Sequence, residues 1–229
     1  MTAPGISLII PFYNSSRYMR QAIDSALNQT VAPTQIIAVD DGSTDDSQAI
    51  ARSYGNAVTV IAKPNGGGAS ARNFGLKAAD RPLIAFLDAD DRLMPEKLER
   101  ELDALADHAE ALLCLCRVRA FWSPEVPERK RHPVDVTPQF RPGQPTSWLA
   151  RRELFERAGN FNVTDAFRLT DGSELFLRIE KANCPVVRIE DALVEHRLHA
   201  SNQTADSRAH RDAIMNLMKR RLDLRRCSS

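Results

Sequence analysis

The feature that most constrains this chain is an apolar run at positions 83–87 that ends abruptly in three carboxylates, Asp88, Asp90 and Asp91. An apolar stretch without polar alternation is typical of a strand buried on both faces of a parallel sheet, and such sheets bind ligands beyond the carboxyl ends of their strands. Mg²⁺ and Mn²⁺ usually take one or two carboxylates together with substrate phosphates. The pattern therefore predicts a metal-bound nucleotide here. The alternative is a solvated acidic turn that opens the next helix.

Strands and helices are expected to alternate over the first half of the chain. Apolar periodicity predicts strands at 6–11, 35–39, 57–62 and 83–88, and helices at 15–29, 43–54, 68–79 and 95–107. This alternation is typical of right-handed βαβ units. We therefore expect an α/β fold with a mainly parallel, doubly wound central sheet.

The second half of the chain has a different composition. A strand is expected at 111–121, followed by an excursion at 122–146 that contains six of the 13 prolines, which prevents a regular helix or central strand. Beyond it we expect helices at 151–158, 172–182 and 205–226 and a strand at 186–189. With 229 residues and 43% hydrophobic content, the chain is predicted to form one domain, 1–229, with a ligand-binding half at 1–107, a second half at 108–204 and a C-terminal helix within 205–229.

Composition excludes several classes of protein. Lys plus Arg (31) nearly balances Asp plus Glu (30), so the net charge gives no indication of nucleic-acid binding. The four cysteines lack the spacing of a metal site or a disulfide scaffold. No signal-like start and no apolar run of about 18 residues is present, so we expect a cytoplasmic protein.

A second pair of acids, Asp40 and Asp41, follows the strand predicted at 35–39. A carboxylate at the end of an early strand can accept hydrogen bonds from a nucleobase or from ribose hydroxyls. Because these acids and the Asp88 cluster should lie at the same sheet edge, we expect them to converge on one ligand. The competing interpretation of 40–43 is a turn with a helix N-cap.

A glycine-rich segment, Asn65-Gly66-Gly67-Gly68, precedes the helix predicted at 68–79. Glycines allow close approach of the backbone, and the amide groups of the first helical turn, beginning at Gly68, favour a phosphate. Arg72 lies one turn into this helix and either reaches the phosphate or faces solvent. The segment lacks the Gly-Lys-Ser/Thr of a Walker A loop and does not follow the first strand, as a dinucleotide fingerprint would.

Four ordered motifs resemble the donor-binding half of family 2 glycosyltransferases. They are Ile9-Ile10-Pro11-Phe12-Tyr13-Asn14, Val39-Asp40-Asp41-Gly42-Ser43-Thr44-Asp45, Asn65 through Gly75 with Ala71-Arg72-Asn73, and Phe86-Leu87-Asp88-Ala89-Asp90-Asp91 with Pro95-Glu96-Lys97-Leu98. The resemblance implies a GT-A fold, a nucleotide-sugar donor, most often a uridine diphosphate sugar, a Mg²⁺ or Mn²⁺ cofactor, and inversion at the anomeric carbon.

The resemblance also implies roles for individual residues. Asp40 matches the acid that binds the nucleobase, Asp88 matches an acid that contacts the nucleotide, and Asp90 matches the metal ligand. The positions that line the base pocket in the family match Pro11, Tyr13 and Asn14.

The C-terminal half departs from the family pattern. The family usually carries a Glu-Asp pair followed by an acid-Leu-x-Leu-Arg helix, whereas this chain has Asp171 followed by Gly172 and then Glu174. Asp171 is the preferred general base, Glu174 is the rival, and an N-cap is the structural alternative for Asp171. His199 matches a histidine that approaches the diphosphate or the metal, with a surface histidine as the alternative.

The resemblance favours an inverting, metal-dependent glycosyltransferase that moves a sugar from a nucleotide diphosphate sugar to an acceptor hydroxyl. The absence of a Gln-x-x-Arg-Trp motif indicates a non-processive enzyme. The alternatives are a catalytically impaired nucleotide-sugar-binding partner protein and a sugar nucleotidyltransferase. The acceptor, which the sequence does not name, is a glycan, a lipid-linked saccharide, a peptide or a small molecule.

The C-terminal helix at 205–226 is amphipathic and basic. Such a helix usually covers the core of its own domain. The alternatives are peripheral contact with an anionic membrane and dimerisation.

Overall fold

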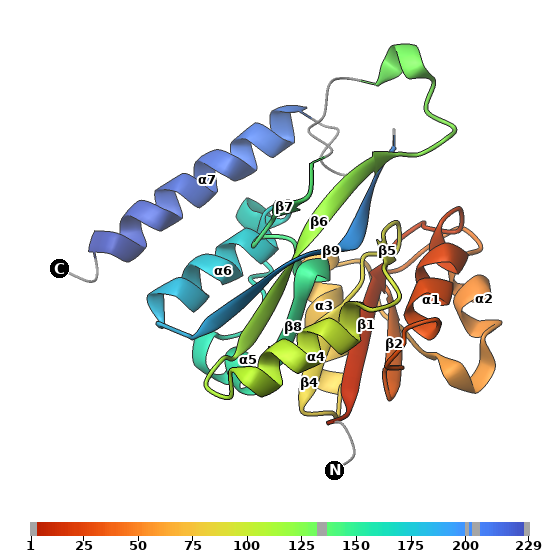
Figure 1. The fold of residues 1–229 in the computed structure, drawn as a ribbon. Helices are drawn as coiled ribbons and strands as arrows, with labels where there is room; N and C mark the ends of the chain where they lie inside the picture. The colour runs from red at the N-terminus through yellow and green to blue at the C-terminus, as the bar shows by residue number, and fades with distance from the viewer. Residues whose placement is uncertain (1–3, 132–136, 200–201, 203–206, 227–229) are drawn as a thin grey trace.

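The computed structural model describes residues 4–131, 137–199, 202 and 207–226 (Figure 1). One mixed sheet forms its centre, with the strand order β3-β2-β1-β4-β8-β6-β9-β5 and with β7 paired to β6 outside this path. The strands are β1 (Ile6–Phe12), β2 (Gln35–Asp40), β3 (Thr59–Ala62), β4 (Leu83–Phe86), β5 (Arg92–Leu93), β6 (Leu113–Trp122), β7 (Gln139–Phe140), β8 (Trp148–Arg151) and β9 (Val186–Leu198).

The first four strands form the parallel part of the sheet. β1 pairs with β2 and β4, β2 pairs with β3, and all three pairings are parallel. Phe12 lies opposite Asp40, which in turn lies opposite Ala62, so the loops that follow these strands meet at one edge. The predicted α/β fold with a mainly parallel sheet is confirmed in this half.

The second half of the sheet is mixed. β8 is antiparallel to both β4 and β6, whereas β9 runs parallel to β6. The strand predicted at 186–189 is longer than expected, because β9 continues through Leu198 along β6 and also pairs with β5. The helix predicted at 151–158 begins at Glu153, because residues 148–151 form the buried strand β8.

Helices cover both faces of the sheet. They are α1 (Met19–Leu27), α2 (Ser47–Arg52), α3 (Gly68–Ala78), α4 (Lys97–Asp107), α5 (Glu153–Ala158), α6 (Asp171–Lys181) and α7 (Ser207–Arg226), with short 3₁₀ turns η1 (Gly55–Ala57), η2 (Glu128–Lys130), η3 (Pro145–Ser147) and η4 (Asp165–Phe167).

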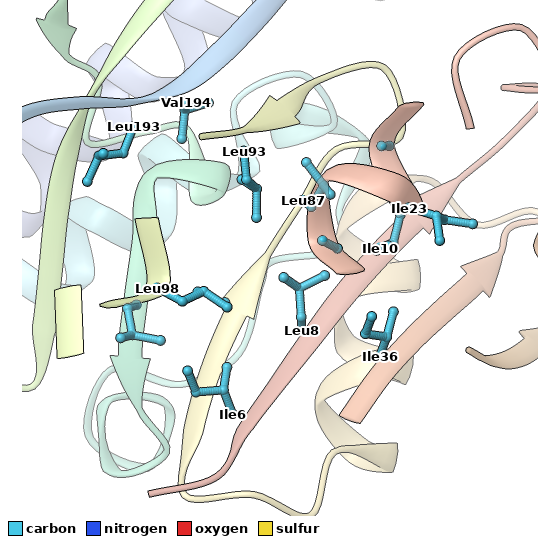
Figure 2. Close-up of a cluster of buried hydrophobic side chains, with 14 of the residues drawn as sticks. Ile6, Leu8, Ile10, Ile23, Ile36, Leu87, Leu93, Leu98, Leu193 and Val194 are labelled. Atoms are coloured by element: carbon cyan, nitrogen blue, oxygen red, sulfur yellow. The ribbon is translucent and has the colours of Figure 1, made fainter. Parts of the chain in front are cut away.

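Alternation along β1 divides the core into two layers. Ile6, Leu8 and Ile10 point into one layer, where Figure 2 shows them with Ile23 of α1 and Leu98 of α4. The second layer lies on the other face of the sheet, beneath α3, α5 and α6. A strand buried on both faces needs apolar residues at every position, which explains the continuous apolar runs in the sequence.

α1 and α2 begin four residues later than their sequence patterns predict, and α4 begins at Lys97 rather than at 95. α1 begins at Met19, because Asn14 has a φ of 48° and the backbone N–H groups of Tyr18 and Met19 both bond to the Ser15 carbonyl in a turn. α2 begins at Ser47, since the chain before it forms a turn in which Asp45 accepts hydrogen bonds from the backbone N–H and the hydroxyl of Ser47. Both turns lie at the carboxyl edge of the sheet.

The C-terminal helix packs on α6. The Arg220 guanidinium lies 3.3 Å from a carboxylate oxygen of Glu174, and the Asn216 amide donates to the Ala166 carbonyl. The predicted start of this helix at 205 and 206 lies outside the described residues, as does much of the centre of the proline-rich excursion (132–136). No helix in the described part of the chain has the length and apolarity needed to cross a membrane.

Candidate functional site

The turn after β2 is held by Asp40, which is buried. One of its carboxylate oxygens accepts the backbone N–H of Ser43 at 2.8 Å, and the other accepts the side-chain amide of Gln48 at 2.8 Å. The Asn14 amide oxygen accepts the Thr44 backbone N–H at 2.8 Å. These hydrogen bonds join the loops after β1 and β2 into one surface of the site. Tyr13 lies on this surface and is 45% exposed.

Pro11 lies within β1 opposite Val39, one position before Phe12 and Asp40. The structure thus brings Pro11, Tyr13, Asn14 and Asp40 to the same corner of the sheet edge. Each oxygen of a carboxylate has two acceptor positions, so Asp40 retains capacity to accept a further N–H.

Asp41 holds the glycine-rich loop. Its two carboxylate oxygens accept the backbone N–H groups of Gly66 at 2.9 Å and of Gly67 at 2.7 Å, and the Lys63 ammonium pairs with it. Gly67 has a φ of 87°, a conformation that favours glycine. Asp41 thus contacts the loop that leads into α3, and it positions the N-terminus of that helix at Gly68.

Arg72 connects two acids that are far apart in the sequence. One nitrogen of its guanidinium lies 2.6 Å from Asp88 after β4, and another lies 2.7 Å from Asp171 at the start of α6. Only 8% of Arg72 is exposed, so the solvent-facing alternative is wrong. Its guanidinium also lies over the Phe161 ring, 5.6 Å from the centroid. The carboxyl edge, the α3 helix and the second half of the chain therefore meet at this arginine.

The Asp171 carboxylate is buried, and burial raises its pKa; the neighbouring Arg72 charge opposes this and the Asp88 charge adds to it, with a net upward shift. A carboxylate with a raised pKa is a stronger proton acceptor than an ordinary one. Thr170 occupies the N-cap position of α6, so Asp171 is the first residue inside the helix, where its carboxylate pairs with the Arg72 guanidinium.

Glu174 lies one turn further along α6 and has a different environment. It is completely buried, and the Arg178 guanidinium contacts both of its oxygens at 2.8 to 3.1 Å. Arg220 of α7 approaches it at 3.3 Å. These two guanidiniums neutralise and cover the Glu174 carboxylate. Glu174 therefore links α6 to α7 and also stabilises the next turn of α6 itself.

Gly172, the position that matches the usual base, has no room for a side chain. A Cβ atom there would lie 2.3 Å from the Gly143 carbonyl oxygen and 2.8 Å from the Pro145 ring. The proline-rich excursion therefore packs directly on the start of α6. This contact leaves no space at position 172 for the second acid of the family pair.

His199, directly after β9, lies beside Asp90, which belongs to the segment between β4 and β5. The Nε2 atom of His199 is 3.1 Å from an Asp90 carboxylate oxygen, and the Asn202 amide is 3.5 Å from the same oxygen. Burial alone would raise the pKa of Asp90, but the hydrogen bond with His199 and the nearby His196 and His199 charges hold it below its ordinary value. The carboxylate thus stays ionised beside an imidazole.

Asp91, the third acid of the cluster, is a structural anchor. It is 1% exposed and accepts the Arg197 backbone N–H at 3.0 Å, the Gln144 amide at 3.0 Å and His196 Nδ1 at 3.0 Å. Burial lowers the pKa of His196, but the Asp91 carboxylate outweighs this and raises it to about 9. Asp91 therefore fixes β9 and the proline-rich excursion beside the site.

Sequence reasoning missed Gln144 and Asn202. Each is a single polar residue in an irregular segment, and no local pattern points to it. The prolines around Gln144 signalled only that the excursion needs a docking surface.

The donor set suits a divalent cation that is completed by a substrate. The described residues contain no group of three His, Cys, Asp or Glu side chains that could hold a metal ion by themselves. Asp90 and His199 nevertheless place one carboxylate oxygen and one imidazole nitrogen side by side, 3.1 Å apart. Mg²⁺ and Mn²⁺ commonly combine one or two protein ligands with phosphate oxygens, so these residues fit such an ion.

The fold and the site define a GT-A glycosyltransferase. The family model "Glycosyl transferase family 2" matches residues 7–171, and the chain belongs to this family.

Three known proteins illustrate the similarity. An uncharacterized glycosyltransferase of Rickettsia typhi is 45% identical over 103 residues, which cover 45% of this chain and 32% of the relative. A mannosyltransferase from Pyrobaculum calidifontis, PcManGT, in complex with GDP-Man and Mn²⁺, is 18% identical with a TM-score of 0.74, covering 97% of this chain and 65% of its own. TarS 1–349 of S. aureus, in complex with UDP-GlcNAc, is 21% identical with a TM-score of 0.70, covering 88% and 61%. The chain spans less than two thirds of each.

Proposed function

We propose that this chain transfers a sugar from a nucleotide diphosphate sugar to an acceptor hydroxyl, with inversion at the anomeric carbon. The observation that carries the proposal is the bridge from Asp88 through Arg72 to Asp171. It places a buried carboxylate of raised pKa beside the sheet edge where ligands of parallel sheets bind.

Asp171 is the proposed general base. It removes the proton of the acceptor hydroxyl as the oxygen attacks the anomeric carbon in line, and Arg72 holds the carboxylate in place for this step. Glu174 is less suited to the same role, because Arg178 and Arg220 already occupy its carboxylate.

The proposed metal ligands are Asp90 and His199. They would hold a Mg²⁺ or Mn²⁺ ion, which would supply positive charge for the departing diphosphate. The ionised state of Asp90, which its histidine neighbours favour, prepares the site for a cation. The structure of the GT-A neighbour PcManGT is a complex with GDP-Man and Mn²⁺, and this supports the choice of that ion for the first assays.

The proposed donor is a uridine diphosphate sugar. Tyr13 is exposed for stacking on the base, Asp40 accepts a base N–H, and Asp88 contacts the nucleotide. The other proposed nucleotide-sugar-binding residues are Pro11, Asn14, Asp41, Gly68 and Arg72. TarS in complex with UDP-GlcNAc supports a uridine nucleotide, whereas PcManGT in complex with GDP-Man makes guanosine the comparison.

The decisive experiment combines binding with turnover. Thermal unfolding in Mn²⁺ with a panel of nucleotide sugars identifies the donor, because ligand at 100 times its dissociation constant adds about 2.7 kcal/mol of stability. Release of nucleoside diphosphate from that donor, compared between wild type and Asp171→Asn, then tests catalysis. Binding without any metal-dependent release in either protein would favour the catalytically impaired partner protein and would refute the proposed transfer.

A further inference from the structure

A cavity lies beside the Asp90–His199 pair. It encloses about 460 Å³ between the start of α1 and the ends of β6 and β9, a volume in the usual range of small-molecule sites. Its lining includes Arg17, Arg92, Arg197, Tyr18, Phe121 and Glu125. None of these residues contributes to the Asp88–Arg72–Asp171 bridge.

Arg197 is a buried charge with neutral partners. It is 3% exposed, and its guanidinium donates to the Gln21 amide oxygen at 2.6 Å, the Ser123 hydroxyl at 3.3 Å and the Asp90 backbone carbonyl at 2.9 Å. Within the described residues it forms no ion pair with a carboxylate side chain. Buried charges are normally paired, because an isolated one is costly; the Glu125 and Asp91 charges act on this guanidinium, but neither carboxylate forms an ion pair with it.

Arg92 supplies a second positive charge to the lining of the cavity, beside Arg197. Both guanidiniums lie over the Phe121 ring, Arg92 at 4.7 Å and Arg197 at 4.8 Å from its centroid. Burial and the Arg92 charge both lower the pKa of Arg197. Arg92 pairs with Glu195 at 2.8 Å, yet its Nε atom is buried and has no hydrogen-bond partner among the described residues. The Nε–H group of Arg92 is therefore an unsatisfied donor in the described part of the chain.

Glu125 is the carboxylate in the lining, and it is already engaged. It accepts hydrogen bonds from the Tyr18 hydroxyl and from Ser123 at 2.5 Å, and Arg17 lies 3.4 Å away. The lining therefore contains three arginines and one carboxylate, and Glu195 pairs with one of the arginines from outside it. Positive side chains outnumber negative ones on the surface of the cavity.

The cavity shares a wall with the proposed metal site. The Tyr18 ring lies 4.8 Å from the His199 ring, and Arg197 bonds to the Asp90 backbone. Tyr18 and Arg197, which line the cavity, are thus in direct contact with the Asp90–His199 pair.

We propose that this cavity binds the phosphate group of a phosphate monoester, as the anion-recognising part of the acceptor site. Guanidiniums match phosphate oxygens geometrically and form strong charge-assisted bonds with them. The volume exceeds that of a bare phosphate, so a hydroxyl-bearing group attached to it also fits. The inference rests on the proposed glycosyl transfer for the acceptor role, but not for anion binding itself.

The test is calorimetric titration of the chain with glycerol 3-phosphate, orthophosphate and glycerol, each in the presence of saturating UDP and Mn²⁺ to occupy the donor site. We expect glycerol 3-phosphate to bind, glycerol not to bind, and Arg92→Gln and Arg17→Gln each to weaken glycerol 3-phosphate at least about tenfold, the loss of one charge-assisted contact. Arg100→Gln is the matched control, because Arg100 also pairs with a carboxylate of β9, Asp191, at 3.2 Å, and it should bind like wild type.

The proposal is overturned if both pocket variants bind glycerol 3-phosphate like wild type while they remain folded. Binding of orthophosphate without glycerol 3-phosphate would remove the acceptor role. UDP affinity measured in the same variants separates this result from failure of the proposed function: intact UDP binding with unchanged phosphate binding refutes only the cavity, whereas weakened phosphate binding without any UDP binding supports the cavity and contradicts the donor assignment.

Discussion

The carboxylate of Asp171 accepts a hydrogen bond of 2.7 Å from the guanidinium of Arg72, although 99 residues separate the two in the chain. This contact joins the glycine-rich helix of the first half to the first turn of α6 in the second. The same guanidinium also holds Asp88. In the proposed mechanism, a donor phosphate that drew Arg72 toward it would change the environment of Asp171, and donor binding would be linked to the strength of the base.

Asp171→Asn should lower turnover about 10² to 10⁴-fold with donor affinity nearly unchanged, because a general base acts only as the acceptor attacks. The measurement is single-turnover release of nucleoside diphosphate together with donor titration. Near-normal transfer by this variant would move the base to another residue.

Glu174→Gln is the companion substitution, and the structure predicts a different result for it. Replacement removes the negative charge that neutralises Arg178 and Arg220, so stability should fall by about 3 kcal/mol, with turnover per folded molecule largely retained. Urea unfolding and turnover at a temperature well below the transition separate the two effects. Collapse of turnover in a fully folded Glu174→Gln protein would instead make Glu174 the base.

Asp90→Ala should abolish Mn²⁺-dependent donor binding and leave the fold intact, because 30% of this side chain is exposed and it contacts the side chains of His199 and Asn202 rather than the core. The measurement is donor titration with Mn²⁺ and with a chelator. Asp103→Ala, an exposed acid on α4, is the control and should retain metal dependence. Equal donor affinity in Asp90→Ala and wild type would remove the proposed metal site.

The parallel half of the fold was predictable because each of its strands is an apolar run that ends in a polar loop, as in Leu83–Phe86 followed by Asp88. The second half was harder for two reasons. β9 carries charged residues such as Arg188 and Glu190 along its length, since it is only partly buried, and β8 passes after one residue into α5, so that strand and helix merge into one apolar pattern.

The candidate site was also predictable only in part. Acids that end strands of a parallel sheet meet at one edge, and this rule brought Asp40 and Asp88 together. No rule of spacing indicates that Arg72 contacts Asp171, or that the loop at Gly143 fills the space beside Gly172. Those contacts depend on how the two halves pack, which single residues do not encode locally.

Gly172→Asp, which restores the second acid of the usual family pair, should destabilise the protein by about 1 to 3 kcal/mol rather than raise its activity, because its Cβ atom would lie 2.3 Å from the Gly143 carbonyl oxygen. Urea unfolding measures the loss. Glu180→Ala on the exposed face of the same helix is the control and should change stability by less than about 0.5 kcal/mol. A stable and more active Gly172→Asp protein would show that the excursion moves away from α6 readily.

The last prediction concerns the Lys97–Glu101 pair, which is fully buried in α4 with an N–O distance of 2.6 Å. Burial raises the pKa of Glu101 to about 7, against an ordinary value of 4.5, and the Lys97 ammonium offsets only part of this shift. The pKa of Lys97 is raised as well, so it stays charged throughout. Burial also raises the pKa values of Cys114 and Cys116, which face the pair and stay neutral.

Because the folded chain binds more protons than the unfolded chain between the two pKa values of Glu101, this group contributes stability that is fully present below pH 4.5 and is lost as the pH rises through 7. The free energy of unfolding should therefore contain a component that falls by about 3 kcal/mol over this range. Glu101→Gln should remove that component, whereas Glu96→Gln, exposed at the start of the same helix, should keep it. Urea unfolding at intervals from pH 4.5 to 7.5 measures the three profiles, and parallel profiles for wild type and Glu101→Gln would contradict the raised pKa.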